Sequence, residues 1–122
     1  MKKLGKGALP AIILFLVIWL VIAPPRFWVN LTRGVDLDDP IAAGKTVAEK
    51  YNCSSCHKIG EEGRTFGPDL NGVTRRLRPE IVDTWLRAPR SMNSDTAMPD
   101  FNLSDSEITA LVAYLTALDE KK

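Results

Sequence analysis

Two cysteines and one histidine stand together as Cys53-Ser54-Ser55-Cys56-His57, and the 122-residue chain contains no others. Thiols at this spacing can both add to the vinyl groups at one edge of a porphyrin, while the adjacent imidazole reaches the iron from one face. The spacing C-x-x-C-H is the attachment signal of c-type haem. The motif therefore predicts one haem c, bound covalently through Cys53 and Cys56, with His57 as an iron ligand.

The cysteine pair has three other interpretations. A thioredoxin-like redox pair needs a βαβ context, and no strand-rich pattern surrounds this motif. A structural zinc ion takes four nitrogen or sulfur ligands, whereas this cluster supplies three at most. A plain disulfide is the third interpretation. We favour haem attachment because it gives a chemical role to all three residues at this spacing.

A haem held by His57 leaves the opposite face of the iron for a second ligand. With no further histidine in the chain, the candidates are Met92, Met98, a lysine, water or no ligand. A methionine thioether is a soft, neutral ligand that favours Fe(II) and raises the reduction potential. We favour Met98, since it precedes Pro99 in a loop that can cross to the opposite face. Either methionine can instead fill a gap in the core.

The first 25 residues have the composition of a membrane segment. Three lysines, at positions 2, 3 and 6, precede an uncharged run from Gly7 to Pro25. Such a run is either a cleaved signal peptide or a retained anchor. Its apolar core, residues 9–23, measures about 22 Å as a helix, against about 30 Å of hydrocarbon. Pro24 disfavours cleavage after Ala23, because proline fixes φ and lacks an N–H. We expect one retained transmembrane helix within residues 1–25.

The charge pattern predicts the orientation of that helix. Lysines before the apolar run indicate a cytoplasmic N-terminus, which places the haem domain on the periplasmic or extracytoplasmic side of the inner (cytoplasmic) membrane. Phe27 and Trp28, after the run, are typical of an interfacial aromatic belt. Residues 31–122 contain 12 basic and 15 acidic residues, a net charge of −3. This balance gives no indication of nucleic-acid binding.

The exported part is expected to consist of a linker, residues 26–39, and a domain, residues 40–122. Amphipathic patterns predict an all-α domain with about three main helices, over residues 40–52, 79–88 and 105–118. Residues 58–78 and 90–102 have the composition of loops, and no window alternates as a strand does. The core of such a domain is small, and a buried porphyrin with two thioether links would add apolar mass and cross-links.

Details within the first and last helices predict how they start and meet. Glycine is a poor helix former, so Gly44 inside the first helix suggests that another helix crosses closely there. The last helix opens with Ser104-Asp105-Ser106-Glu107, the pattern of a capping box, and Leu103 before it is a candidate hydrophobic staple. The first helix should bury a stripe at i, i+3, i+7 and i+10: Ile41, Gly44, Ala48 and Tyr51.

The order and spacing of these motifs resemble a class I, mono-haem cytochrome c of the membrane-anchored bacterial type. The resemblance covers roughly residues 40–118 and implies the helical cytochrome c fold, with the first and last helices crossing near the haem edge. It also implies that the Pro68 carbonyl accepts a hydrogen bond from the His57 ring, which would orient the imidazole. The matching segments are Gly44-Lys45, 51–57, Gly67-Pro68-Asp69-Leu70, 85–89, 97–101, Leu103-Ser104-Asp105 and Ala113-Tyr114-Leu115.

Further side chains are candidates for contact with the haem propionates. The indole N–H of Trp85 could donate to a propionate, or the ring could simply fill the core. Arginines are concentrated in residues 64–90. One of them, Arg75 or its neighbour Arg76, could neutralise a propionate, and a solvated charged face is the alternative.

The function expected from these residues is electron transfer. No free histidine or cysteine is left for acid–base or nucleophilic catalysis, so we expect neither an enzyme nor a small-molecule substrate. We predict a membrane-tethered carrier of single electrons between respiratory-chain complexes. Its partners would be membrane-bound redox proteins: a quinol-oxidising complex as donor, and a terminal oxidase or another reductase as acceptor. The tether would raise the effective concentration of the domain near such partners.

Three other functions are weighed against this one. A fixed cytochrome subunit of such a complex is the main alternative, with an unchanged haem site. A gas-binding sensor or small haem enzyme would need an open sixth position on the iron. A metal-free scaffold would carry no haem.

Overall fold

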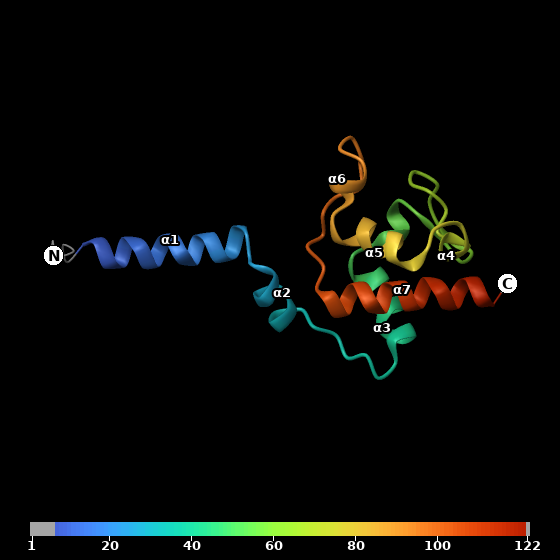
Figure 1. The fold of residues 1–122 in the computed structure, drawn as a ribbon, viewed down its shortest axis with the longest axis horizontal. Coiled ribbons are helices and arrows are strands. Elements are labelled where there is room, and N and C mark those ends of the chain that lie inside the picture. Colours follow the sequence, from blue (N-terminus) through green and yellow to red (C-terminus); the bar gives the residue numbers. More distant parts are fainter. Residues whose placement is uncertain (1–6, 122) are drawn as a thin grey trace.

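The computed structural model of the chain describes residues 7–121. Figure 1 shows helix α1 projecting as a rod from a helical body, in which α7 is the longest helix. The helices are α1 (Ala8–Ile22), α2 (Arg26–Thr32), α3 (Pro40–Lys50), α4 (Val73–Arg76), α5 (Pro79–Arg87), α6 (Pro89–Met92) and α7 (Asp105–Glu120). A 3-10 turn, η1 (Cys53–Ser55), and two strands, β1 (Lys58–Ile59) and β2 (Glu62–Gly63), follow α3.

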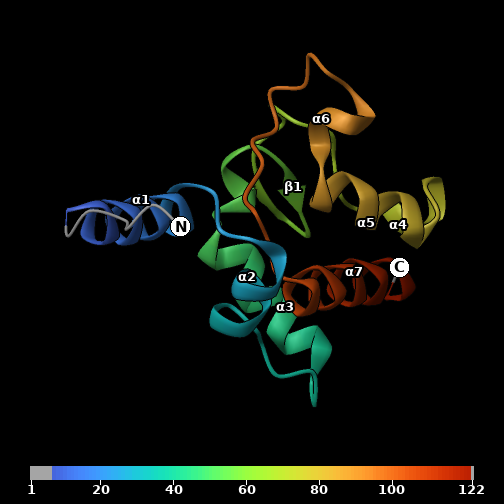
Figure 2. The ribbon, with the colours of Figure 1, turned by 60° about the vertical axis from the view of Figure 1, so that its left-hand side comes forward.

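The core of the body lies where α3 crosses α7, a crossing that Figure 2 shows from a second side. Gly44 permits this crossing: a Cβ at residue 44 would stand 2.0 Å from the carbonyl oxygen of Ala110 and 2.6 Å from Cβ of Tyr114. The close crossing predicted from this glycine is therefore confirmed. Around it the two helices bury Val47, Ala48, Leu103, Ile108 and Leu111.

Helix α7 begins as its sequence predicts. The Ser104 hydroxyl accepts from the Glu107 N–H at 3.1 Å, and the Glu107 carboxylate accepts from the Ser104 N–H at 2.9 Å. The capping box is thus complete. Leu103 and Ile108 are both buried in the same core cluster, the arrangement of a hydrophobic staple.

Helix α3 is shorter than expected, and its buried face is the predicted one except at Ile41. It ends at Lys50, because Asn52 takes the left-handed conformation at φ 53° and starts the next turn. Ile41 is 45% exposed, so its place in the predicted buried stripe is wrong. Val47, which is 1% exposed, packs there instead, since residues 44, 47 and 48 share the face toward α7.

The expected loops contain short elements. Strands β1 and β2 pair antiparallel, with Lys58 opposite Gly63 and Ile59 opposite Glu62. Helices α4 and α6, of four residues each, also lie in or beside these loops. Periodicity cannot reveal elements this short, because they complete at most about one helical turn. The three main helices of the body are α3, α5 and α7, as predicted.

The segment predicted as a linker also contains a helix. Residues 26–32 form α2, in which Val29 is 1% exposed and Arg26 donates to the Leu103 carbonyl at 3.1 Å. Residues 26–39 are therefore not a free tether over their whole length.

The apolar N-terminal helix is short. Of the residues from 7 to 121, no one helix is long and apolar enough to span a membrane. Helices α1 and α2 meet that criterion only as a pair, bent by 70° at the break between them. All the residues of α1 are solvent-accessible. Lys2, Lys3 and Lys6, on which the predicted orientation depends, lie outside the described residues.

Candidate haem-attachment site

A single turn of chain carries the two thiols and the imidazole. The N–H groups of Cys56 and His57 both donate to the Cys53 carbonyl, at 3.2 and 3.0 Å, and this closes η1. Cys53 and Cys56 are half-buried and are not joined in a disulfide. Burial raises the pKa of the Cys53 thiol. The turn brings together the three groups that covalent haem attachment requires.

The imidazole of His57 is held from the neighbouring loop. Its Nδ1 lies 2.7 Å from the Pro68 carbonyl oxygen, which is the contact that the family resemblance implies. Because a carbonyl can only accept, this contact places the ring proton on Nδ1 and leaves the Nε2 lone pair for a metal ion. Within residues 7–121, Nε2 has no hydrogen-bond partner.

Gly67 fits closely against the same ring. A Cβ at residue 67 would stand 2.7 Å from Cε1 and 2.8 Å from Nδ1 of His57. The Gly67 N–H donates to the Cys56 carbonyl at 2.6 Å, which ties the loop to the attachment turn. Glycine is therefore required by space, and the loop both packs on the imidazole and hydrogen-bonds it.

Asn71, which the sequence did not single out, fixes this loop to the hairpin. Its side-chain amide accepts from the Gly60 N–H at 2.8 Å and donates to the Gly60 carbonyl at 3.0 Å. The Leu70 N–H donates to the Lys58 carbonyl at 2.9 Å. The available signal for this role was an asparagine in a glycine-rich loop, because one side-chain amide can both donate to and accept from the backbone of another segment.

The remaining predicted residues are placed as follows. Met98 is half-buried in the loop before α7, and its N–H donates to the Thr96 hydroxyl at 3.2 Å. Met92 is 38% exposed at the end of α6. Trp85 is half-buried in α5, and its indole N–H makes no hydrogen bond within residues 7–121. The structure places Cys53, Cys56 and His57 on one turn and the Pro68 carbonyl beside the imidazole of His57.

The arginines considered for a propionate have protein partners. Arg75 donates to the main-chain carbonyl of Asp119, near the end of α7, at 2.9 Å. Arg76 donates to the carbonyls of Asp69 and Asn71, the latter at 2.6 Å. Arg76 thus supports the loop that holds His57, while Arg75 contacts the end of α7.

Asp119 is a buried carboxylate that the sequence did not single out. Asp119 accepts from the backbone N–H of Gly72 and from both the N–H and hydroxyl of Thr74, the last two at 2.8 and 2.6 Å. It therefore anchors α4 to α7. Its side chain can supply these bonds because α4 has unpaired N–H groups at its start.

Glu107 joins the end of α3 to α7 just before the attachment turn. Its carboxylate is fully buried and accepts from Lys50 at 2.7 Å and from the Tyr51 hydroxyl at 3.1 Å. Burial raises the pKa of Glu107, but the hydrogen bonds from Lys50, the Ser104 N–H and Tyr51 outweigh it and leave the pKa below its ordinary value.

The alternatives to haem find no support in this geometry. The described chain, residues 7–121, contains no group of three or more His, Cys, Asp or Glu side chains that could hold a metal ion. The cysteines form no disulfide. The only strands in residues 7–121 are two residues long, so the βαβ context of a thioredoxin-like pair is missing there.

The family of the chain follows from its match to a family model. The model for cytochrome c matches residues 41–119, from the first turn of α3 to the last turn of α7. The chain belongs to the cytochrome c family. The match confirms that the cofactor of this cytochrome is haem c and that its domain is an electron-transfer domain. The donor set fits that group: two thiols and an oriented imidazole on one turn.

Several relatives of the cytochrome carry the same name. It is 28% identical to the C subunit of nitric oxide reductase from Halomonas halodenitrificans, over 86% of this chain and 78% of that protein. It is 31% identical to the same protein of Stutzerimonas stutzeri and 30% identical to that of Paracoccus denitrificans, each over 69% of this chain. The last two alignments span 62% and 64% of the relatives' own lengths, so the cytochrome covers under two thirds of each.

The alignment with the Halomonas protein extends beyond the domain. Residues 40–122 are about two thirds of the chain, whereas the alignment covers 86% of it. Part of the N-terminal segment, before Pro40, is therefore included in the similarity.

Proposed function

We propose that this cytochrome is the electron-transfer subunit of a membrane-bound redox complex, and that it delivers electrons to a reductase of the nitric oxide reductase type. The observation that carries this proposal is the similarity to the C subunit of nitric oxide reductase, which extends over 86% of the chain. It favours the fixed-subunit alternative over the membrane-tethered carrier predicted from the sequence. Nitric oxide would be reduced on a partner subunit and not on this chain.

The residues of the attachment site have defined roles in this proposal. Haem c, bound through Cys53 and Cys56, supplies one-electron Fe(II)/Fe(III) chemistry. His57 would bind the iron through Nε2, while its Nδ1–H bond to Pro68 holds the ring in one orientation. Gly67 leaves the imidazole the space it occupies. Met98 would bind on the opposite face and so keep small molecules from the iron.

The two candidates for a propionate contact differ in the hydrogen bonds they already make. Trp85 has an indole N–H that makes no other hydrogen bond within the described chain, so it is available to a propionate. Arg75 would have to share its guanidinium between a propionate and the Asp119 carbonyl. We therefore keep Trp85 as the stronger candidate.

The location proposed for the complex is the cytoplasmic membrane. Helix α1 would insert with the lysine-bearing N-terminus in the cytoplasm and the haem domain outside. All its residues are accessible, as expected of a helix whose apolar surface meets lipid or a partner's helices. The second candidate function is the mobile tethered carrier. The docking of α2 onto the body argues against it, because this contact limits how far the domain can swing from α1.

Gentle solubilisation of native membranes separates the two functions. We expect the haem c to elute with large partner subunits, in a fraction that reduces nitric oxide when supplied with electrons. Elution of the cytochrome alone, with the reductase activity in another fraction, would support the mobile carrier. A complex with a different catalytic activity would keep the subunit role and overturn the named acceptor.

A pair of methionine variants tests the second iron ligand. Met98→Ala should abolish the weak far-red band of the ferric protein and allow the reduced protein to bind CO. Met92→Ala is the matched control and should keep the band. The opposite pattern would move the ligand to Met92. CO binding by the unaltered protein would indicate an open site.

A further inference from the structure

Helix α2 divides into two faces of opposite character. At about 100° per residue, Arg26, Val29, Asn30 and Arg33 share one side, and Phe27, Trp28, Leu31 and Thr32 share the other. The first face is turned to the body of the protein. The second is exposed and mainly apolar, with Phe27 at 69% and Leu31 at 76% exposure.

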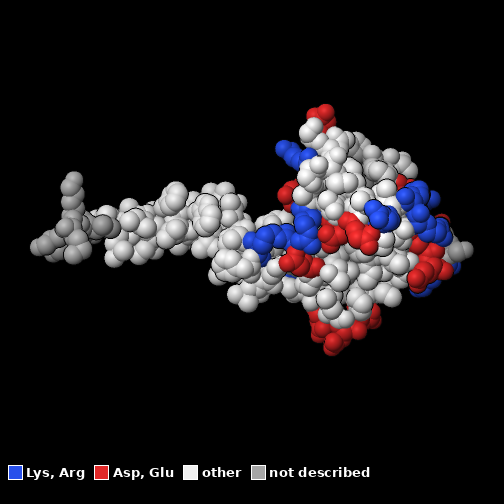
Figure 3. All heavy atoms as spheres, in the orientation of Figure 1, with Lys and Arg blue, Asp and Glu red and all other residues white. Residues whose placement is uncertain are grey.

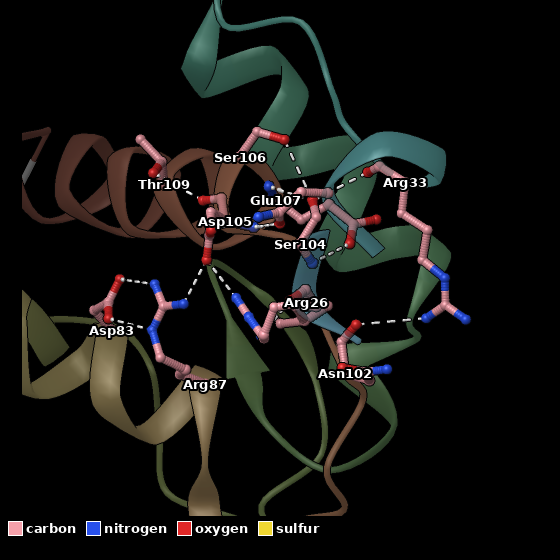
Figure 4. Close-up of polar contacts among 12 residues, drawn as sticks. Arg26, Arg33, Asp83, Arg87, Asn102, Ser104, Asp105, Ser106, Glu107 and Thr109 are labelled. Atoms are coloured by element: carbon pink, nitrogen blue, oxygen red, sulfur yellow. Dashed lines mark hydrogen bonds and ion pairs between the residues drawn. The ribbon is translucent and has the colours of Figure 1, made fainter. Parts of the chain in front are cut away.

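The inner face is fixed to the start of α7. Figure 4 shows Arg26 and Arg87 directed at the same carboxylate, that of Asp105. Arg26 also donates to the Leu103 carbonyl at 3.1 Å. Asn30 donates to Asp105 at 2.6 Å and accepts from the Asp105 N–H at 2.9 Å.

The contacts continue past the end of α2. The Ser104 hydroxyl donates to the Arg33 carbonyl at 3.1 Å, and the Val35 N–H donates to the Ser106 hydroxyl at 3.0 Å. Val29, on the same side of α2 as Arg26 and Arg33, is buried. One face of α2 is thus fully used by the body, and its orientation on the body is defined.

The outer face continues the apolar surface of α1. Figure 3 shows α1 as a rod without charged residues, and charges appear where it meets the body. Around the break at Pro24-Pro25, the two helices line a half-open hollow of about 350 Å³, whose mainly apolar lining has Leu20, Pro24 and Trp28 and also includes Arg33. The apolar surface of α1 and the exposed apolar side chains of α2 thus lie on either side of this break.

Length and angle place this face at a membrane boundary. Helix α1 spans about 22 Å, less than the hydrocarbon thickness of about 30 Å, so the chain leaves it close to the lipid headgroups. Helix α2 is bent from α1 by 70°. When α1 stands near the membrane normal, α2 therefore lies nearly in the membrane plane, where aromatic side chains are favoured.

We propose that the outer face of α2, formed by Phe27, Trp28 and Leu31, lies in the headgroup layer of the phospholipid membrane and holds the haem domain in one orientation on it. The inference rests on the part of the proposed function in which α1 inserts. Its partner is the lipid surface. The inner face transmits this orientation to α7 through Asp105.

Spin labels on the full-length haem protein in vesicles of phosphatidylcholine and phosphatidylglycerol test this arrangement. Phe27→Cys and Leu31→Cys each carry a nitroxide on the outer face. Ile41→Cys, at another exposed aliphatic residue, is the matched control. Phe15→Cys reports on α1. Power saturation compares access by oxygen, which enters lipid, with access by a water-soluble nickel chelate. For each label, the increase in relaxation caused by oxygen is divided by the increase caused by nickel. Both increases are taken relative to a sample without either relaxant, so the constant effect of the haem iron cancels.

We expect labels at 27 and 31 to be reached mainly by oxygen, at a depth shallower than residue 15, and the label at 41 mainly by nickel. Nickel-accessible labels at 27 and 31, with residue 15 still in lipid, would overturn the inference and leave the anchor intact. Protection of 27 and 31 only after a partner complex is added would overturn it in favour of a protein contact. Nickel access at residue 15 would overturn the inserted anchor itself.

Discussion

Gly44 and Ala110 are in direct main-chain contact, so close that a Cβ on residue 44 would stand 2.0 Å from the Ala110 carbonyl oxygen. This contact sets the distance between α3 and α7. It therefore also sets how the attachment turn, which follows α3, sits against the helix that closes the body.

Gly44→Ala should be strongly destabilising. The added methyl group meets backbone on α7, which cannot move without separating the helices, and overpacking of this kind costs about 1–3 kcal/mol or more. We expect a lower midpoint of guanidinium unfolding. Lys45→Ala, at the exposed neighbouring position, is the control and should change the midpoint little. Equal midpoints for the two variants would show that the crossing is not rigid.

Gly67→Ala should disturb the iron ligand and not only the fold. Its Cβ would press on the imidazole 2.7 Å away, so the ring must tilt and weaken its bond to the Pro68 carbonyl. We expect a changed reduction potential and a changed ferric absorption spectrum. The neighbouring exposed residue supplies the control, Phe66→Ala. An unchanged reduction potential in Gly67→Ala would mean that the loop around residue 67 moves to make room and the imidazole of His57 keeps its position.

Glu107→Gln should change the pH dependence of stability. The pKa of Glu107 is lower in the folded than in the unfolded protein, so its contribution is present above the ordinary value of 4.5 and is lost as the pH falls through the folded pKa. The variant should be less stable near neutral pH, and its deficit should shrink below about pH 4.5. Chemical unfolding across this range measures the difference. Glu61→Gln, at an exposed position, is the matched control and should change the stability little. A Glu107→Gln deficit that does not vary with pH would contradict a lowered pKa in the folded state.

Val29→Asp should detach α2 from the body. Val29 is 1% exposed, and a carboxylate in its place must give up most of its hydration, which destabilises the docked state. In detergent, trypsin should then cut after Arg33 at least about tenfold faster, since cleavage follows the population of the open form. Leu31→Asp places the same charge on the exposed face and should leave the rate unchanged. Fast cleavage of the unaltered protein would show that α2 is not docked.

The features that sequence predicted correctly are local ones. The attachment turn is five consecutive residues, and the capping box of α7 lies within four. Gly44 indicated a helix crossing because glycine inside a helix needs a reason, although the sequence did not name Ala110 as the opposing residue. Each of these signals depends on short-range stereochemistry.

The features that escaped prediction depend on contacts between distant residues. Arg26 and Asp105 are 79 positions apart, and nothing near either of them identifies the other. Val29 falls in the segment predicted as a linker, and only the fold shows that it is buried. Arg75 was considered for a propionate from local charge density, but its observed acceptor is a backbone carbonyl 44 positions away.

The docking of α2 decides where this cytochrome can be shortened. The predicted domain boundary, Pro40, would be the obvious first residue of a shortened protein that lacks α1. Such a cut would leave Asp105 without Arg26 and Asn30 and the Leu103 carbonyl without its donor. Starting the protein at Pro24-Pro25 would remove the apolar helix α1 and keep the contacts of Arg26 and Asn30. Residues 26–35, although predicted as part of a linker, therefore belong with the haem domain in any shortened version of the protein.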